Sequence, residues 1–347
     1  MVAFGLDRAI PVERLGTGHI HRTWLVGAET VVQRLNERVF PDLDRVMENL
    51  DRITAHLARR CPQWTDRSPL RTRDGALVAR DDGRGRWRAQ PFVPGVVPGP
   101  DADLVDLRSA GLAFGSFLAA LHDLDPPPGE TITRFHDLGR RRRELQAAIA
   151  ADRVDRLAGG AIDVDRAHDL DTVVGPVAAT IGQLPLRTVH NDAKLANVVL
   201  DPVDREARAV LDLDTTMPGT ALSDLGELVR SSVAATTEEG VGGSGPGGVD
   251  PGRFAAVVAG YLAGCGDRLT DEEHALCPWA GAVLSYENAI RYLADHLDGD
   301  RYFAVDYPGH NLVRARAQLR LTEDLVEAQP ELTAALESAI GPDRPNS

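Results

Sequence analysis

A polar segment at residues 190–197, HNDAKLAN, stands between two apolar, strand-like stretches of the chain. It contains a carboxylate, Asp192, followed after two residues by Lys194 and after five by the amide of Asn197. The next apolar stretch ends in a second carboxylate, Asp212. Phosphoryl transfer needs such a set, because a carboxylate must orient the attacking hydroxyl, a cation must face the γ-phosphate, and hard oxygen ligands must hold Mg²⁺. The spacing therefore predicts Asp192 as the catalytic base, Lys194 as the phosphate-facing cation, and Asn197 and Asp212 as Mg²⁺ ligands, with ATP as co-substrate.

Three neighbouring residues allow more than one interpretation. His190 stands where the protein-kinase loop HRDLKPEN has its histidine, and we expect it to hydrogen-bond backbone rather than to act as an acid or base. Asp214 is a possible second metal ligand, because alternation along a strand would point it to the same face as Asp212. Asp224 is expected to anchor the loop or to cap a helix. A plain polar β-hairpin would need no such combination of acid, amide and later carboxylate.

The N-terminal part of the chain offers candidates for a nucleotide site. A glycine-containing turn between strand-like segments favours contact with nucleotide phosphates, although plain hairpins often contain such a turn too. The turn consists of Gly16, Thr17, Gly18 and His19. The stretch 90–95, which includes Gln90 and Phe92, is the expected hinge that meets adenine through backbone groups.

Kinases also carry a cation on the third strand that pairs with the α- and β-phosphates. Lys194 is the only lysine in this chain, so that cation must be an arginine. The strand at 31–35 offers Arg34, whose guanidinium can hold phosphates bidentately. Glu48, in the helix that follows, is its candidate partner. The alternatives are a solvent-exposed strand arginine and a surface carboxylate.

The order of elements predicts an α+β, bilobal protein-kinase-like fold. Residues 12–35 suggest short strands, residues 42–60 an amphipathic helix, and residues 76–80 and 86–93 further strands. A Pro/Gly-rich stretch at 94–100 marks a boundary, so we expect a nucleotide-binding lobe at 1–95 and a catalytic and substrate-binding lobe at 96–347. Helices are expected at 103–123, 139–157, 163–182, 222–235, 252–265, 271–297 and 309–328, around a β-type island at 187–213. The glycine-rich segment 238–252 is expected to be a mobile loop.

Composition narrows the class of partner. A net charge of −14 argues against nucleic acid or an anionic membrane as a partner, because phosphate backbones are held by basic surfaces. No secretory or membrane-spanning pattern stands out, and three dispersed cysteines fit reduced thiols, so a cytoplasmic location is expected. The ten histidines show no paired spacing for zinc. The expected partners are a nucleotide and a small-molecule acceptor, and the expected state is a monomer or a weak homodimer.

Several stretches in both lobes resemble the aminoglycoside phosphotransferase superfamily, and within it most closely the N-acetylhexosamine 1-kinases. The stretches are residues 16–21, 32–36, 47–50, 53–57, 190–198, 211–219, 286–293, 295–303, 310–312 and 314–316. The Gln-Arg strand that contains Arg34 also occurs in that family. The glycine-rich segment 238–252 is not part of its pattern, and Asn191 replaces the glycine of most aminoglycoside kinases.

The resemblance implies phosphorylation of the anomeric hydroxyl of a 2-acetamido sugar. Arg291 and Tyr302 lie where the family places residues that contact the sugar, and Asp192 would also touch the reacting hydroxyl. Other acceptors stay open, since one fold serves many substrates: an aminoglycoside, a nucleoside antibiotic, homoserine or choline. A catalytically dead nucleotide-binding module and a protein-interaction domain are further alternatives, and the presence of Asp192, Asn197 and Asp212 together disfavours both.

Overall fold

The structure, a computed structural model, describes residues 2–7, 9–15, 20–81, 83, 85–234 and 248–340. Its N-terminal part is an antiparallel sheet with the strand order β1-β2-β3-β5-β4. The strands are β1 (Val12–Arg14), β2 (Arg22–Val26), β3 (Thr30–Arg34), β4 (Ala79–Asp81) and β5 (Gly85–Pro91). One face of this sheet buries a small apolar cluster around Val26, Val32 and Ala89.

Helix α1 (Leu43–Arg60) joins the sheet to the rest of the molecule. It begins at Asp42, whose side chain accepts a hydrogen bond from the Arg45 amide. Its apolar face, which includes Leu43 and Leu50, is buried in the main core rather than in the cluster under the sheet. The helix therefore anchors the N-terminal sheet to the helical part of the chain.

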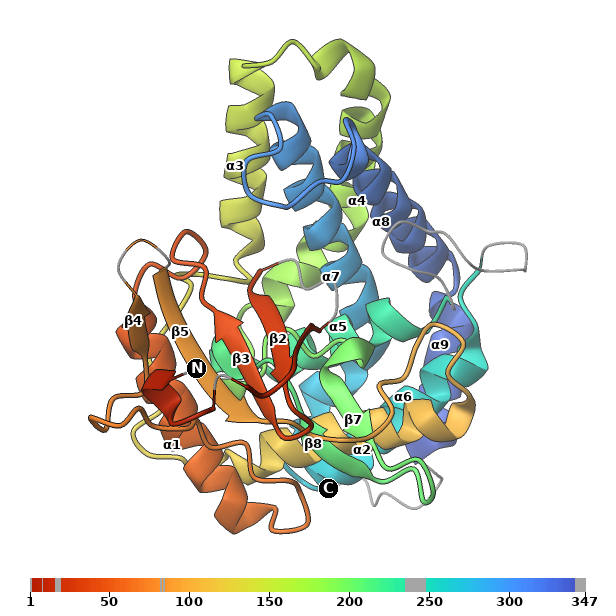
Figure 1. Cartoon of the computed structure of the whole chain (residues 1–347). Helices are drawn as coiled ribbons and strands as arrows, with labels where there is room; N and C mark the ends of the chain where they lie inside the picture. The colour runs from red at the N-terminus through yellow and green to blue at the C-terminus, as the bar shows by residue number, and fades with distance from the viewer. Residues whose placement is uncertain are drawn as a thin grey trace.

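Helices dominate the chain after the sheet. They are α2 (Leu104–Ala120), α3 (Leu138–Ala151), α4 (Leu157–Ile181), α5 (Ala221–Ser232), α6 (Pro251–Cys265), α7 (Asp271–Leu297), α8 (His310–Glu327) and α9 (Gln329–Ile340). In Figure 1, α3, α4, α7 and α8 rise together above the level of the sheet, and α2 and α6 lie below them. The sheet at one end and the helices at the other confirm the α+β, protein-kinase-like fold.

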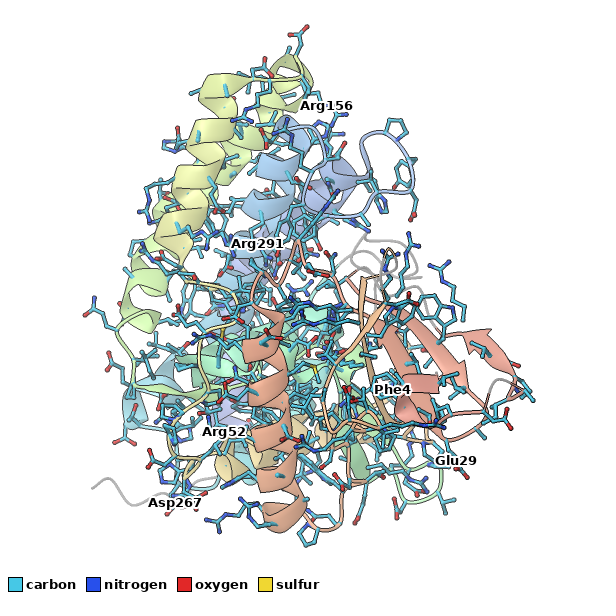
Figure 2. The ribbon with its side chains drawn as sticks, turned by 60° about the vertical axis from the view of Figure 1, so that its left-hand side comes forward. Phe4, Glu29, Arg52, Arg156, Asp267 and Arg291 are labelled. Atoms are coloured by element: carbon cyan, nitrogen blue, oxygen red, sulfur yellow. The ribbon has the colours of Figure 1, made fainter. Side chains whose placement is uncertain are left out.

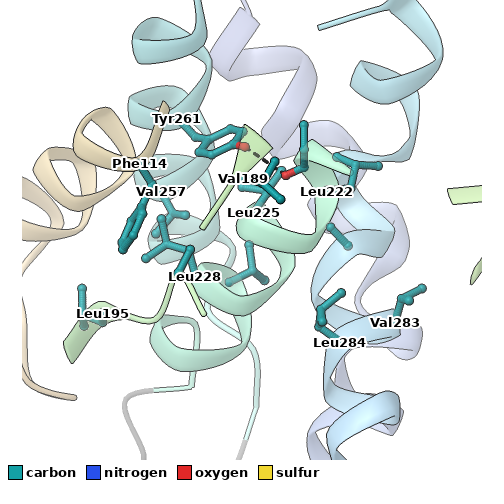
Figure 3. Close-up of a cluster of buried hydrophobic side chains, with 14 of the residues drawn as sticks. Phe114, Val189, Leu195, Leu222, Leu225, Leu228, Val257, Tyr261, Val283 and Leu284 are labelled. Atoms are coloured by element: carbon teal, nitrogen blue, oxygen red, sulfur yellow. Dashed lines mark hydrogen bonds between the residues drawn. The ribbon is translucent and has the colours of Figure 1, made fainter. Parts of the chain in front are cut away.

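Helices α2 and α6 cross with almost no space between their backbones. A Cβ atom on Gly260 would lie 2.0 Å from the Arg108 carbonyl oxygen, and one on Gly115 would lie 2.1 Å from the Tyr261 carbonyl oxygen. Only glycine allows this approach, because any side chain would force the helices apart. The crossing forms the base on which α5 rests, and the Tyr261 hydroxyl donates to the Ala221 carbonyl at the start of α5 (2.9 Å; Figure 3).

Two small two-stranded sheets carry the polar segment singled out above. Strand β6 (Leu186–Val189) pairs with β9 (Met217–Thr220), and β7 (Val198–Leu200) pairs with β8 (Ala207–Val210). Residues 190–197 connect β6 to β7 and lie directly above the buried helix α5. Val189, which ends β6, and Leu195, within the connection, are buried in the same core as Leu225 and Leu228 of α5, and Figure 3 labels all four.

Some expected boundaries differ from the structure. Helix α4 begins at Leu157, so the two helices expected at 139–157 and 163–182 meet in a short turn. Strand β9 and helix α9 were not expected. Most of the segment 238–252 lies outside the described residues, and α6 begins at Pro251. Among the described residues, no helix is long and apolar enough to cross a membrane.

Candidate active site

A cleft of about 1130 Å³ runs between the N-terminal sheet and the helices. Its walls bring together eight of the residues proposed from the sequence. They are Gln90, Phe92, Asp192, Lys194, Asn197, Asp212, Arg291 and Tyr302. The proposed phosphate turn, Gly16, Thr17, Gly18 and His19, lies outside the described residues; Leu15 and Ile20, which flank it in the sequence, line the cleft.

Asp192 lies in the cleft with its carboxylate held by two neighbours in the same loop. Lys194 Nζ lies 3.0 Å from Asp192 Oδ2, and Asn197 Nδ2 donates to the same oxygen at 3.0 Å and to the Asp192 carbonyl at 2.8 Å. The loop geometry thus depends on contacts between residues that are at most five positions apart. Such local contacts fix the orientation of the carboxylate before any ligand binds, which is the preorganisation that phosphoryl transfer requires.

Buried groups beneath the cleft hold the backbone of the loop. The Asp224 carboxylate on α5 accepts the amide hydrogens of His190 (2.8 Å) and Asn191 (2.6 Å), which confirms that Asp224 anchors the loop. Burial raises the pKa of Asp224. His190 donates through Nε2 to the Leu211 carbonyl (2.7 Å) and accepts the Asp192 amide through Nδ1 (3.2 Å), as a structural histidine should. Asn191 adopts φ +62°, a left-handed conformation that asparagine tolerates better than most residues.

Asn197 and Asp212 fit a site for Mg²⁺. The Asn197 side chain donates both of its hydrogen bonds to Asp192 through Nδ2, and among the described residues its Oδ1 has no partner. The Asp212 carboxylate lines the cleft and makes no hydrogen bond or ion pair within the described part of the chain. Mg²⁺ takes few protein ligands and prefers hard oxygens, so one carboxylate and one amide oxygen suit it when phosphates supply the rest.

Asp214 has a different environment from Asp212. Strand β8 ends at Val210, and Asp212 has φ +55°, so strand alternation does not apply to the two aspartates. Asp214 is buried and forms a two-pronged ion pair with Arg88 of β5, in which Nη2 and Oδ2 are 2.9 Å apart. His21 Nε2 lies 2.6 Å from the same carboxylate. Burial opposes the charge, but Arg88 and His21 outweigh it and hold the pKa of Asp214 below its ordinary value.

The structure does not bring Arg34 and Glu48 into the cleft. Arg34 lies exposed at the end of β3, and Glu48 is exposed on α1. The β3 residues that line the cleft are Val31 and Gln33, and Gln33 stands opposite Arg88 of β5 in the strand register. Gln33 Oε1 accepts a hydrogen bond from Arg88 Nε at 2.8 Å. Among the described residues, the buried cation beside the third strand is therefore Arg88.

The hinge is tied into the sheet. Gln90 is buried, and its Nε2 donates to the Arg67 carbonyl at 2.9 Å. The Phe92 amide donates to the Glu29 carbonyl at 2.7 Å, so this amide is already used within the chain. Arg67 also lines the cleft, where its Nη1 donates to the Val210 carbonyl at 3.2 Å. Burial and the nearby charge of Arg88 lower the pKa of Arg67 to about 10.

The far end of the cleft is formed by α7 and its flanking loops. The Arg291 guanidinium lies between the rings of Phe135 (5.1 Å) and Phe303 (5.4 Å), and Tyr302 stacks edge-on against Phe303. Arg291 Nη1 donates to Asn288 Oδ1 at 3.1 Å. Figure 2 labels Arg291 near the middle of the molecule. A guanidinium between aromatic rings is held rigidly, with its edge available to a ligand.

Several cleft residues have no local signal in the sequence. His136 and Glu287 are 151 positions apart yet lie 3.1 Å from each other, and Arg88 reaches Asp214 across 126 positions. The sequence offers one hint for Arg88, since alternation along its strand places it on the same face as Gln90, and both side chains line the cleft. His136 follows a phenylalanine in the loop before α3, and only the tertiary fold brings it to the cleft.

The sheet, the cleft and its polar loop are those of a phosphotransferase with a protein-kinase-like fold. The chain belongs to the APH phosphotransferase enzyme family, whose sequence profile matches residues 11–279. The matched segment includes the sheet, the polar loop at 190–197 and the first part of α7. The chain is therefore a kinase of small molecules in its broad class.

Solved structures with the same fold cover nearly the whole chain. A microcompartment-associated aminopropanol kinase has a TM-score of 0.64 at 18% identity, covering 94% of this chain and 96% of that one. A spectinomycin phosphotransferase in complex with ADP and spectinomycin has a TM-score of 0.60 at 14% identity, covering 95% and 96%. A choline/ethanolamine kinase family protein from Mesorhizobium loti has a TM-score of 0.58 at 16% identity, covering 96% and 94%. These identities show a shared fold and leave the acceptor open.

Proposed function

We propose that the protein is an ATP- and Mg²⁺-dependent kinase that phosphorylates a sugar hydroxyl, specifically the anomeric hydroxyl of an N-acetylhexosamine. The observation that carries the kinase assignment is the Asp192 carboxylate, fixed by Lys194 and Asn197 on the floor of the cleft. The sugar acceptor is supported by the resemblance of residues 286–303 and by the aromatic and guanidinium groups around Arg291.

In the proposed reaction, Asp192 orients the acceptor hydroxyl and accepts its proton as the oxygen attacks the γ-phosphorus in line with the leaving ADP. Lys194 offsets the charge that develops on the transferred phosphoryl group. Asn197 and Asp212 would hold Mg²⁺, which neutralises charge on the phosphates when it is bound. Most of the acceleration then comes from positioning and electrostatics, and no covalent intermediate on the protein is required.

The nucleotide would lie under the sheet. The hinge at 90–95 and the turn at 16–19 remain the proposed contacts for adenine and phosphates. For the third-strand cation we now propose Arg88 in place of Arg34, because Arg88 lines the cleft and Arg34 is exposed outside it. Three of its donor groups serve Gln33 and Asp214, and a guanidinium has five N–H groups in all, so donors remain for a phosphate oxygen.

Cationic acceptors such as an amino alcohol or an aminoglycoside are the second candidate, because three structural neighbours are named as kinases of such molecules. A cationic acceptor would have to lie beside the Arg291 guanidinium, which would repel it, although the nearby carboxylates of Glu287 and Glu227 offset part of that charge. A neutral sugar can stack on Phe303 and Tyr302 and accept hydrogen bonds from Arg291 without that repulsion. The geometry therefore favours the sugar.

The test is a phosphate-transfer screen with MgATP against amino sugars, plain hexoses, aminoglycosides and amino alcohols. We expect turnover with an N-acetylhexosamine, loss of turnover in Asp192→Asn, and retention of the thermal shift that MgATP produces. Asp201→Asn is the matched control, since Asp201 pairs with Arg208 in the β7–β8 turn, away from the catalytic loop. Normal turnover in Asp192→Asn would refute the catalytic assignment, and turnover with amino alcohols alone would refute the sugar acceptor.

A second comparison tests the phosphate cation. Arg88→Met should reduce the thermal shift caused by MgATP, while Arg34→Met should leave that shift unchanged. The shift is measured for each variant against its own ligand-free melting temperature, so any loss of stability is subtracted. The reverse result would return the phosphate contact to Arg34.

A further inference from the structure

His136 forms part of the cleft wall in the loop between α2 and α3. Its ring is buried except for about 10% of the side chain. Nδ1 lies 3.1 Å and 3.2 Å from the two carboxylate oxygens of Glu287 on α7, and Nε2 lies 2.8 Å from the carbonyl oxygen of Asn191. Asn191 directly precedes Asp192, so one ring connects α7 to the peptide group of the catalytic residue.

Both ring nitrogens of His136 therefore face hydrogen-bond acceptors. A carbonyl oxygen cannot donate, so Nε2 must carry a hydrogen, and an ionised Glu287 can only accept, so Nδ1 must carry one as well. The ring is then an imidazolium with two N–H groups. Two other buried histidines differ. His190 accepts a backbone amide through Nδ1, and His56 faces the Arg59 guanidinium through Nδ1, so each has a nitrogen that accepts.

The charges around His136 favour this state. Burial would lower the pKa of His136, but the charge of Glu287, its hydrogen bond and the more distant Glu227 outweigh burial and raise that pKa. The pKa of Glu287 is lowered by His136, Arg291 and Arg141, which again outweigh burial. The charged groups that face the pair are Glu287 and Arg291 from α7, Arg141 from α3, and Glu227 and Asp224 from α5.

We propose that His136 is a positioning residue that acts as an imidazolium between Glu287 and the Asn191 carbonyl. It holds the peptide group before Asp192 and so couples the acceptor helix α7 to the catalytic loop. The proposal rests on the role of Asp192 given above. The coupling is direct, because Asn288 and Arg291 at the acceptor end follow Glu287 on the same helix. A shift of α7 would be transmitted through two short hydrogen bonds to the loop that carries Asp192.

This arrangement predicts a dependence on pH. Because the pKa of His136 is raised in the folded protein, the clamp is complete below the ordinary histidine pKa of about 6.5 and is lost as the pH rises through the raised pKa. The neutral ring retains one N–H and can serve only one of its two acceptors. Since displacement of a catalytic group by about 1 Å can cost on the order of 100-fold in rate, turnover should fall on the alkaline side.

The first experiment needs no acceptor. Uniform ¹⁵N labelling of the full chain reports whether each histidine ring nitrogen is protonated and also gives the backbone amide signals, and His136→Gln identifies the signals of His136. We expect both nitrogens of His136 to stay protonated at about pH 6.5, where half of an ordinary histidine population is neutral. We also expect the ¹⁵N signal of the Asp192 amide to move with the titration of His136. A His136 ring that titrates at or below about pH 6.5, or an Asp192 amide signal that does not change with the titration of His136, would overturn the proposal.

The second experiment uses the acceptor found by the screen. His136→Gln should lower kcat by about 10- to 100-fold and remove the alkaline fall of kcat, while the KM for ATP stays unchanged. Glu287→Gln should move the alkaline fall to lower pH, because the imidazolium loses its ionised partner. His56→Gln is the matched control, since His56 is also buried and bonded to a backbone carbonyl and a carboxylate outside the cleft. A lower melting temperature with an unchanged pH profile would mean that His136 is merely structural.

Discussion

The ion pair between Asp214 and Arg88 fastens the N-terminal sheet to the catalytic core, and its removal should be costly. Arg88 comes from β5, and Asp214 follows the proposed metal ligand Asp212. Asp214→Asn keeps the size of the side chain and removes its charge. The Arg88 guanidinium then remains buried without a charged partner, while His21 loses the carboxylate beside its Nε2.

The burial of both partners sets the expected size of the effect. The side chains of Arg88 and Asp214 are 2% and 1% exposed, so water cannot replace the lost carboxylate. Removing one member of a buried pair costs about 3–5 kcal/mol, because an uncompensated charge stays inside the protein. Typical folding free energies are about 5–15 kcal/mol, so the loss is a large part of the total.

Urea unfolding followed by far-ultraviolet circular dichroism measures this loss. The matched control is Asp51→Asn, which removes a carboxylate 2.7 Å from Arg71 in a pair that is largely exposed. The control should lose no more than about 1 kcal/mol, because exposed pairs are screened by solvent. A loss under about 1 kcal/mol in Asp214→Asn, equal to that of the control, would show that the buried pair does not secure the sheet.

Three further predictions concern packing, loop anchoring and acid. Gly260→Ala should destabilise the protein by about 1–3 kcal/mol in urea unfolding because its Cβ would overlap α2, whereas Gly159→Ala, with open space around it, should be neutral or stabilising by up to about 1 kcal/mol. Equal effects would contradict the close crossing. Asp224→Asn, which can accept only one of the two loop amides, should lower kcat by about 10- to 100-fold with MgATP binding retained in a thermal-shift assay. The pKa of Asp214 is lowered on folding, so the ionised carboxylate stabilises the protein above about pH 4, and this stabilisation is lost as the pH falls further. On acidification below about pH 4, the melting temperature of the wild type should therefore drop more than that of Asp214→Asn.

Local patterns were enough to predict most of the helices and the fold class. Helix α7 is capped by Thr270, whose capping box with Glu273 is visible in the sequence. The length of the helix follows from a long helical pattern. The pairing of β6 with β9 was not predictable in the same way. Residues 190–216 separate these two short strands, and a strand of four residues has too little pattern to reveal its partner.

The same division holds for the active site. Asp192, Lys194 and Asn197 contact one another within one loop, so their spacing was enough to predict that they lie together. The prediction that Arg34 supplies the cation in the cleft did not account for strand alternation, by which only every second residue of β3 faces the cleft. Gln33 holds that place, and the sequence alone does not fix the register that sets Arg88 opposite it.

The absence of a lysine on β3 has a consequence for the metal site. An arginine in the place of such a lysine is always charged, and when it is buried it needs a carboxylate that can bind both prongs of its guanidinium. Glu48 cannot serve as this carboxylate, because it is exposed outside the cleft. Asp214 provides that partner, and both of its oxygens are then occupied by Arg88 and His21. Of the two aspartates, Asp212 is the one that lines the cleft, which supports its proposed role as a ligand of Mg²⁺.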